Sequence, residues 1–253
     1  MQSCSAGAYR GYQFAEFKEV DGLAHVFGGR NELDRGNLAF SGGRDLLAAR
    51  EARRAWSKYL QVPAEDWVVG GQVHTHNVAS VDATHRGRGA LSPEHVVSAC
   101  DGLITTTPGL PLYVAVADCS AVLLHAPGVL AVVHGGWRGL AKGILGVAVN
   151  RFAALGVPPS QIRAGIAPCI AATSYEVGPE VGDACPESAR YSGVGDRWQV
   201  DIALWAQASL IQNGVEPASI VLSGIDTGSD ESCFSHRRQG PGAGRNGLIA
   251  VLT

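Results

Sequence analysis

Apolar side chains recur at helical spacing in two stretches of the chain and predict helices over residues 46–60 and 140–155, each with one apolar face. A third helix is predicted over residues 202–213, with Asp201 as its N-cap. Gly156 and Gly214 directly follow the second and third predicted helices, and glycine readily takes the left-handed conformation at which helices end. The first two helices are expected to pack their apolar faces against a core.

Shorter apolar runs, separated by proline, glycine or aspartate, predict strands. They lie at residues 67–73, 104–107, 112–117, 122–125, 130–134 and 247–252. Helices and strands do not alternate regularly, which favours an α+β fold with layered, mixed sheets over a doubly wound one. With 253 residues, 46% of them hydrophobic, residues 1–253 are expected to form a single domain around one large core. Residues 83–95, rich in arginine, glycine, serine and proline, are expected to be an exposed loop.

Charge and composition exclude some classes of partner. The formal net charge is −3, so the chain lacks the basic footprint of a protein that binds nucleic acid or an anionic membrane. The most apolar region, residues 110–133, is interrupted by Asp118, His125 and Pro127, which predicts buried strands instead of a membrane span. Six cysteines occur without a C-x-x-C pair, and residues 1–12 lack the apolar core of a signal peptide. We therefore expect a cytoplasmic protein with free thiols.

Three predicted strands each end on a residue that can bind a metal ion. These residues are His74, Cys119 and His134. One thiolate and two imidazoles favour zinc and leave a fourth position open for water or substrate. An open zinc site lowers the pKa of a bound water toward neutrality, which suits hydrolytic chemistry. Two alternatives stay open on spacing alone: His76 is the inward-facing residue instead of His74, and Cys119 is only a small buried side chain.

Two glycine-containing segments carry basic side chains. Residues 135–139 open the second predicted helix, where free N–H groups together with Arg138 suit a phosphate or a carboxylate. Alternatively, Arg138 pairs with a structural carboxylate. Residues 235–238 include His236 and Arg237 and precede a glycine-rich loop. This segment is either an anion-binding lid or a solvated surface.

An ordered set of motifs resembles the YfiH-like laccase-domain family. The set covers nearly the whole chain in the family's order. It consists of Gln72-Val73-His74, Asp101-Gly102-Leu103-Ile104-Thr105, Ala117-Asp118-Cys119, His134-Gly135-Gly136-Trp137-Arg138-Gly139, Tyr175-Glu176-Val177-Gly178, Val200-Asp201-Ile202, Ser235-His236-Arg237-Arg238 and Gly244-Arg245.

The resemblance implies a purine nucleoside phosphorylase with adenosine deaminase activity, in a family also called multicopper polyphenol oxidases. It implies that His74, Cys119 and His134 are the zinc ligands, which resolves the choice of the first histidine. It also implies that Arg54 faces the active site, joined by Arg30, where basic groups suit the phosphate co-substrate. The implied fold has mixed sheets flanked by helices and is similar to cysteine-hydrolase folds.

Four positions depart from the family's usual pattern. Arg53 stands where asparagine is frequent, and Gly135 stands where alanine is usual. Ile166-Ala167-Pro168-Cys169 replaces a turn of the type Ile-Gly-Pro-Ala, and Asp226 precedes Thr227 where many members have cysteine. These departures leave the three metal ligands intact and bear on substrate preference.

The leading hypothesis is a zinc enzyme with two reactions in one pocket: phosphorolysis of adenosine, inosine or guanosine to base and ribose 1-phosphate, and deamination of adenosine. Deamination needs an activated water at C6 and a proton shuttle, for which Asp118 is the candidate. Alternatively, Asp118 only positions the ligand Cys119. Phosphorolysis passes through an oxocarbenium-like state, so arginines that position phosphate should dominate. Arg138, His236 and Arg237 are expected to contact the substrate, in a monomer or small homo-oligomer.

Three other functions are compatible with the same residues. In a cysteine hydrolase acting on a peptidoglycan precursor, Cys119 is the nucleophile and His134 its base. In a copper-dependent polyphenol oxidase the metal is copper, although the single His74-Thr75-His76 pair is too little for a four-copper array. In a zinc-stabilised binding module the site is closed by a fourth ligand, and none is evident in the sequence. Metal content and sensitivity to thiol alkylation distinguish these functions.

Overall fold

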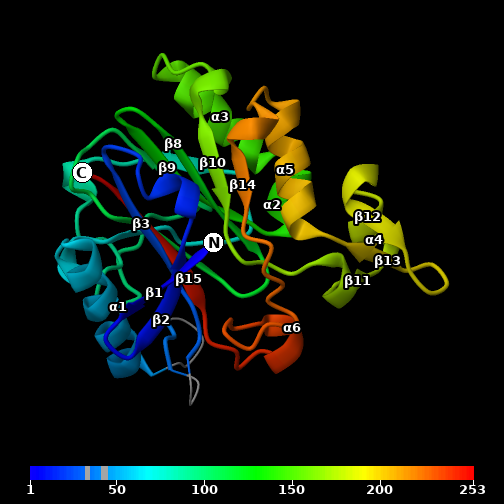
Figure 1. Ribbon diagram of the computed structural model, residues 1–253, viewed down its shortest axis with the longest axis horizontal. Coiled ribbons are helices and arrows are strands. Elements are labelled where there is room, and N and C mark those ends of the chain that lie inside the picture. The colour runs from blue at the N-terminus through cyan, green and yellow to red at the C-terminus, as the bar shows by residue number, and fades with distance from the viewer. Residues whose placement is uncertain (32–34, 41–44) are drawn as a thin grey trace.

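Two six-stranded sheets, stacked face to face, form the centre of the molecule (Figure 1). The computed structural model describes residues 1–31, 35–40 and 45–253. In the first sheet the strand order is β1 (Gln2–Ala6), β2 (Tyr9–Gln13), β3 (Leu23–Gly28), β15 (Asn246–Leu252), β7 (Leu112–Val116), β4 (Val68–Val69). In the second it is β14 (Ile220–Leu222), β10 (Arg163–Ile166), β8 (Ser120–Ala126), β9 (Val129–Gly135), β6 (Gly102–Thr105), β5 (Val78–Ser80). Most pairs are antiparallel, but β4–β7, β5–β6 and β10–β14 are parallel, so both sheets are mixed as predicted.

Apolar side chains fill the space between the two sheets. Phe27, Val114 and Leu248 from the first sheet pack in one cluster with Leu123 and Val132 from the second. Successive residues of a strand point to opposite faces. Every residue of β8 and β9 is buried, so the second sheet is covered on its outer face as well.

Helices cover both outer faces, which gives four layers. α1 (Leu46–Leu60) lies on the first sheet, where Trp56 packs in one cluster with Tyr113. α3 (Ile144–Ala154) and α5 (Ile202–Gln212) lie on the second sheet, on the opposite side of the molecule from α1 (Figure 1). The predicted α+β fold with layered sheets and flanking helices is confirmed.

Aspartate caps fix the start of two predicted helices. The Asp45 carboxylate accepts hydrogen bonds from the N–H groups of Leu47 and Ala48 at the start of α1. The Asp201 carboxylate accepts one from the N–H of Leu204 at the start of α5. Both helices therefore begin where the sequence predicts.

The prediction of one continuous helix over residues 140–155 is wrong. The chain forms α2 (Trp137–Ala141), then a break, then α3 (Ile144–Ala154). Gly143 takes a left-handed conformation at the break, with φ 77°. The apolar periodicity continues on both sides of the break, which is why the pattern predicts one helix.

The strand predicted over residues 67–73 is much shorter in the structure. Only β4 (Val68–Val69) pairs with β7, and the chain then turns away from the sheet. Gln72 and His74 have positive φ values, which no β-strand contains. His74 thus lies on a bent segment instead of at a strand end.

The predicted loop at residues 83–95 is confirmed as irregular, apart from one 3-10 turn at Ala83–His85. It is not exposed throughout, because Ala90 is buried. The carbonyl groups of Gly89 and Ala90 accept hydrogen bonds from the guanidinium of Arg53.

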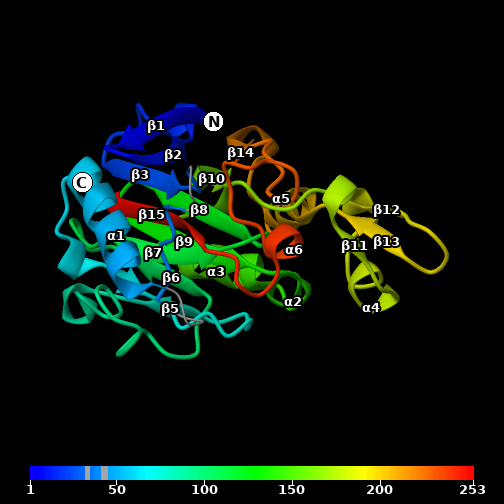
Figure 2. The same ribbon diagram turned by 90° about the horizontal axis from the view of Figure 1, so that it is seen from below.

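A small lobe projects from the layered body (Figure 2). It contains α4 (Pro179–Gly182) and a three-stranded sheet with the order β11 (Glu176–Val177), β13 (Trp198–Val200), β12 (Arg190–Ser192). The short helix α6 (His236–Gln239) contacts its base, where Arg237 donates to the carbonyl oxygen of Glu176. In the described ranges, no helix combines the length and the apolar character needed to cross a bilayer.

Candidate metal centre and active-site cavity

Two histidines and one cysteine converge at one edge of the sheets. His74 follows β4, Cys119 lies in the turn between β7 and β8, and His134 belongs to β9. Their donor atoms all lie within 4.8 Å of one another. With zinc–sulfur and zinc–nitrogen bonds of about 2.3 and 2.1 Å, one ion could reach all three donors. Within the part of the chain that the structure describes, no other group of His, Cys, Asp and Glu converges in this way.

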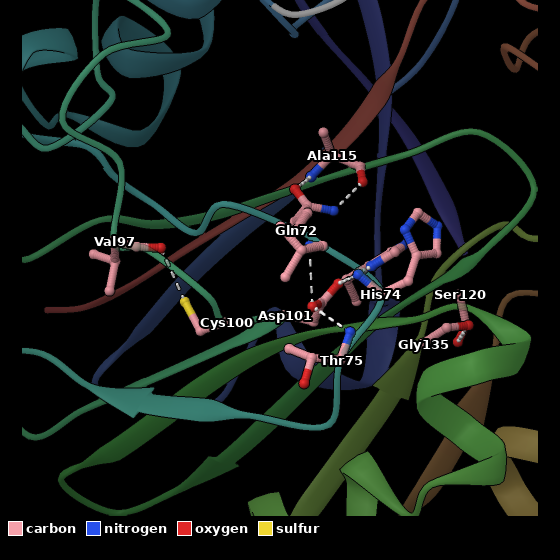
Figure 3. Close-up of polar contacts among 11 residues, drawn as sticks. Gln72, His74, Thr75, Val97, Cys100, Asp101, Ala115, Ser120 and Gly135 are labelled. Atoms are coloured by element: carbon pink, nitrogen blue, oxygen red, sulfur yellow. Dashed lines mark hydrogen bonds and ion pairs between the residues drawn. The ribbon is translucent and has the colours of Figure 1, made fainter.

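The buried carboxylate of Asp101 contacts both histidines, and Figure 3 shows it beside His74 and Thr75. Its Oδ1 accepts hydrogen bonds from Nδ1 of His134 at 2.8 Å and from the backbone N–H of His74 at 3.0 Å. Its Oδ2 accepts from the N–H groups of Val73 and Thr75. Because Nδ1 of His134 donates to the carboxylate, Nε2 is the nitrogen available to a metal ion.

Sequence reasoning missed the role of Asp101. The residue occurs in a motif of the family, but its spacing from the ligands gives no hint of contact. One signal was available: Asp101 directly precedes Gly102-Leu103-Ile104-Thr105, a run that predicts a buried strand, and a carboxylate at such a position needs hydrogen-bond partners.

Left-handed backbone conformations gather beside the ligands. Gln72, His74 and Asp118 have φ values of 46°, 60° and 83°, which are costly for residues other than glycine. Hydrogen bonds hold them in place. The Gln72 side chain pairs with both backbone groups of Ala115, at 2.6 and 2.8 Å, just where the main-chain pairing of β4 with β7 has stopped (Figure 3).

The Cys119 thiol and the His134 imidazole polarise each other. Burial alone would raise the pKa of the thiol, but His134 and His74 lower it to about 6. Burial alone would lower the pKa of His134, while the neighbouring Cys119 and Asp101 raise it to about 9. The thiolate is therefore favoured at neutral pH, and the thiolate is the form that ligates metals and attacks as a nucleophile.

The three donors open into a cavity of about 590 Å³. This size is typical of small-molecule sites. Aromatic side chains form part of its wall, namely those of Phe40, Tyr113, Trp137 and Tyr175. Its charged and ionisable lining outside the ligands consists of Arg53, Asp118, His236, Arg237 and Arg245.

Asp118 is the one carboxylate among the lining residues that the structure describes. Its Oδ1 accepts a hydrogen bond from the Thr227 hydroxyl at 2.7 Å, and its Oδ2 accepts one from the backbone N–H of Arg237 at 2.6 Å. Its own carbonyl oxygen accepts from the N–H of Ile170 at 2.9 Å. Asp118 thereby ties the turn that carries Cys119 to three neighbouring segments.

Comparison with known proteins places this geometry in a family. The model of the multi-copper polyphenol oxidoreductase laccase family matches residues 27–253. The chain belongs to this family. Among relatives in the laccase family, adenosine deaminase RL5 from an unknown prokaryotic organism is 30% identical over 90% of this chain and 93% of its own length. Purine nucleoside phosphorylase YlmD of Geobacillus stearothermophilus is 32% identical over 89% of this chain and 87% of its own.

Solved structures with the same fold extend over almost the full chain. YlmD from Geobacillus stearothermophilus superposes with a TM-score of 0.91, at 26% identity, and covers 100% of this chain and 98% of its own. YfiH from Bacillus licheniformis has a TM-score of 0.89, at 24% identity, with 97% of each chain covered. The laccase-family fold expected from the motifs is thus confirmed, whereas the expected similarity to cysteine-hydrolase folds is not.

The expected substrate-binding residues separate into two groups. His236 and Arg237 line the cavity. Arg138 does not line it: it is exposed and stacks on Trp137, with 4.3 Å from Cζ to the ring centroid. Arg30 also lies outside the lining and donates to the carbonyl oxygen of Glu231.

On α1 the cavity is lined by Arg53, not by Arg54, which is exposed. The helical spacing alone predicts that Arg53 lies on the buried face. Arg53 lies four residues after Ala49, three before Trp56 and seven before Leu60, so it shares the buried face of the helix. Arg54 is one residue farther along and points elsewhere.

Two of the departures from the laccase-family pattern have structural explanations. A methyl group at Gly135 would collide with the hydroxyl of Ser120, which donates to the Gly135 carbonyl oxygen at 3.0 Å. Asp226 accepts hydrogen bonds from the N–H groups of Ala171 and Gly228 and from the Ser174 hydroxyl, and so fastens two loops together. Cys169 is buried, and nothing in the structure explains its presence in this turn.

Proposed function

We propose that this chain is a zinc-dependent purine nucleoside enzyme that deaminates adenosine and cleaves nucleosides with phosphate. The observation that carries the proposal is the convergence of His74, Cys119 and His134 within 4.8 Å at a cavity of about 590 Å³. The names of relatives that align along most of the chain, an adenosine deaminase and a purine nucleoside phosphorylase, supply the two reactions.

The chain's own residues prepare the ligand set. Asp101 holds His134 in the tautomer that leaves Nε2 for the ion, and the lowered pKa of Cys119 favours the thiolate at neutral pH. A zinc ion in this position supplies Lewis-acid polarisation of water or substrate. Gly136 completes the pocket, because a Cβ there would lie 3.2–3.5 Å from side-chain atoms of all three ligands.

In deamination, a water molecule adds to C6 of adenosine, and ammonia leaves after a proton reaches the amino group. Asp118 is our candidate for this proton transfer, because it is the one carboxylate among the described lining residues. It also retains some exposure, at 8%. The bonds from Thr227 and Arg237 orient its carboxylate.

In phosphorolysis, a phosphate oxygen attacks C1′ of the ribose and the purine base leaves. The transition state carries positive charge on the sugar and gains most from a correctly placed phosphate. Arg237 and His236 line the cavity and are our candidates to bind this phosphate. Tyr175, which lies under the Arg237 guanidinium with 4.9 Å from Cζ to the ring centroid, offers an aromatic surface to the base.

Metal analysis and product analysis of the purified protein test the proposal together. We expect about one zinc per chain, inosine from adenosine in phosphate-free buffer, and free base with ribose 1-phosphate when phosphate is added. A chain with no affinity for zinc that leaves nucleosides unchanged under all conditions contradicts the proposal.

One specific observation favours a second candidate function, a cysteine hydrolase. Cys119, His134 and Asp101 form the series of thiolate, imidazole and carboxylate that activates a nucleophilic thiol. In this case Cys119 attacks a carbonyl group of the substrate, for which a peptidoglycan precursor is the candidate, and His134 protonates the leaving amine.

Thiol alkylation separates the two functions. For the zinc enzyme, zinc protects Cys119 from iodoacetamide and chelators abolish activity. For the hydrolase, the metal-free chain cleaves its substrate and zinc inhibits by occupying the nucleophile. A copper-dependent oxidation finds less support, because within the described residues the convergent donors are one thiolate and two imidazoles, too few for a multi-copper cluster.

A further inference from the structure

The cavity extends well beyond the metal ligands. Strand β7 and the turn after it run along the cavity: Tyr113, Ala115 and Val116 of the strand line it, as do Ala117 and Cys119 of the turn. Tyr113 and Cys119 are six residues apart in the chain, so at most about 20 Å separates them. A purine nucleoside whose C6 lies at the metal ligands is shorter than this, so the far part of the cavity is left for another group.

Arg53 stands at this far end. Its guanidinium lies 4.7 Å from the ring centroid of Tyr113 and 4.0 Å from that of Phe40, and the residue is 2% exposed. Nε donates to the carbonyl oxygen of Leu38, and Nη1 donates to the carbonyl oxygens of Gly89 and Ala90. A side-chain hydrogen bond with Tyr113 adds to these contacts.

The positive charge of Arg53 has no counter-ion among the residues that the structure describes. Its hydrogen bonds go to neutral groups, three backbone carbonyls and the side chain of Tyr113, and it packs against aromatic rings. Burying a charge without an opposite charge is costly. Burial accordingly lowers the pKa of Arg53. An anion bound in the cavity would offset this cost.

Positive groups recur along the length of the cavity. Arg245 directly precedes β15, whose first residue, Asn246, pairs with Val116 of β7, so Arg245 lies level with Ala117, toward the Cys119 end. Its Nη1 already donates to the carbonyl oxygens of Ala243 and Gly244. Arg237 adds a third guanidinium to the lining. The single carboxylate in the described lining, Asp118, already accepts hydrogen bonds on both oxygens.

From this arrangement we propose that the part of the cavity between Arg245 and Arg53 binds a phosphate group carried by the substrate itself. The ligand class is a purine nucleoside 5′-phosphate, with the base toward Cys119 and the phosphate toward Arg53. Arginine forks bind phosphate oxygens through paired N–H groups, and they do so more strongly where water is excluded. The orientation of the base rests on the proposed function; the phosphate subsite does not.

Inosine and inosine 5′-monophosphate are clean probes for this subsite. In phosphate-free buffer neither is a substrate of the proposed reactions, so binding to the zinc-loaded protein can be measured by calorimetry without turnover. We expect the monophosphate to bind at least about tenfold more tightly than inosine. Equal affinity for the two ligands would overturn the proposal without any variant.

Variants assign the effect to the two arginines. Arg53→Met and Arg245→Met are each expected to reduce the advantage of the monophosphate to less than about threefold, with little change in the affinity for inosine. Arg151→Met, which removes an exposed guanidinium from α3, is the matched control and should keep the full advantage. If Arg53→Met does not fold, the wild-type comparison and Arg245→Met decide. An advantage that survives in both folded variants contradicts the subsite.

Binding of inorganic phosphate is the third measurement. If it binds in an Arg53-dependent way while the nucleoside and its monophosphate bind equally, the far site holds a free anion, and the nucleotide assignment is wrong. Failure of the proposed function looks different. In that case adenosine is not converted under any condition, yet the monophosphate keeps its Arg53-dependent advantage over inosine.

Discussion

The Oδ1 atom of Asp101 lies 2.8 Å from Nδ1 of His134, and both side chains are buried. The same carboxylate accepts hydrogen bonds from three consecutive backbone N–H groups, those of Val73, His74 and Thr75. One acid therefore fixes the ring of His134 and the backbone of His74, two candidate metal ligands from different segments. Four donors converge on two oxygens, which only an ionised carboxylate can satisfy.

Asp101→Asn should weaken zinc binding by about 10–100-fold. The amide has one acceptor oxygen and directs its NH₂ group at donors that are themselves N–H groups, so His134 and the His74 segment lose their fixed positions. The measurement is zinc affinity by competition with a chromophoric chelator. Asp82→Asn, an exposed cap remote from the cavity lining, is the control. An unchanged zinc affinity in Asp101→Asn contradicts the orienting role.

Cys119→Ala should lose both bound zinc and nucleoside turnover. Removing the thiolate leaves two imidazoles, too few for a stable zinc site in a protein. Metal content after dialysis and the rate of inosine formation give the two measurements. Cys4→Ala, on the edge strand β1, should retain both. Full activity in a metal-free Cys119→Ala protein would remove the basis of the proposed site.

Gly135→Ala should destabilise the fold by about 1–3 kcal/mol, because its methyl group collides with the Ser120 hydroxyl. In the Ser120→Ala background the collision is gone, and the same substitution should cost much less. Urea unfolding of the wild type, both single variants and the double variant forms a double-mutant cycle. If Gly135→Ala costs the same in both backgrounds, the Ser120 contact does not explain the glycine.

Acidification should destabilise the protein through a buried histidine. Burial and the neighbouring His125 hold the pKa of His25 at about 4, and its Nε2 accepts a hydrogen bond from the N–H of Phe14. The folded-state pKa is lower than the value of 6.5 in the unfolded chain, so the unfolded state binds more protons between pH 6.5 and 4. Stability is therefore lost as the pH falls through this window, by about 2 kcal/mol from pH 7 to pH 5.

His25→Gln tests this assignment, since glutamine keeps an acceptor but does not titrate. The variant should lose less stability between pH 7 and pH 5 than the wild type, by about 2 kcal/mol, in urea unfolding at the two pH values. His95→Gln, at an exposed position, should behave like the wild type. Identical pH dependence in all three proteins would assign the acid sensitivity to other groups.

Local chemistry made α1 and α5 predictable. Both begin at an aspartate cap, whose geometry lies within a few residues of sequence, and α1 also has one apolar face. The same criteria miss the break at Gly143, because the apolar face continues across it. A single left-handed glycine does not disturb the periodicity that predicts a helix.

The candidate site was less accessible to local patterns, because its geometry depends on contacts far apart in the sequence. Strand alternation cannot choose between His74 and His76, since the segment is not a strand; family resemblance was needed. Asp101 acts across 27 and 33 residues of sequence, to His74 and His134. Such long-range hydrogen bonds leave no periodic trace. For Arg53 the helical spacing did contain the answer, and the family's Asn-Arg pattern pointed one residue too far.

The three metal donors come from segments that the fold keeps in different layers. His74 follows a strand of the first sheet, His134 belongs to the second, and Cys119 lies in the turn where the chain crosses between them. An ion bound there would link the segments from the two sheets at the edge where these side chains converge. The unfolded chain has no such site, so occupancy by zinc would raise the melting temperature in proportion to the logarithm of the free metal concentration above its dissociation constant. The free zinc concentration would then affect the stability of the folded protein as well as its activity.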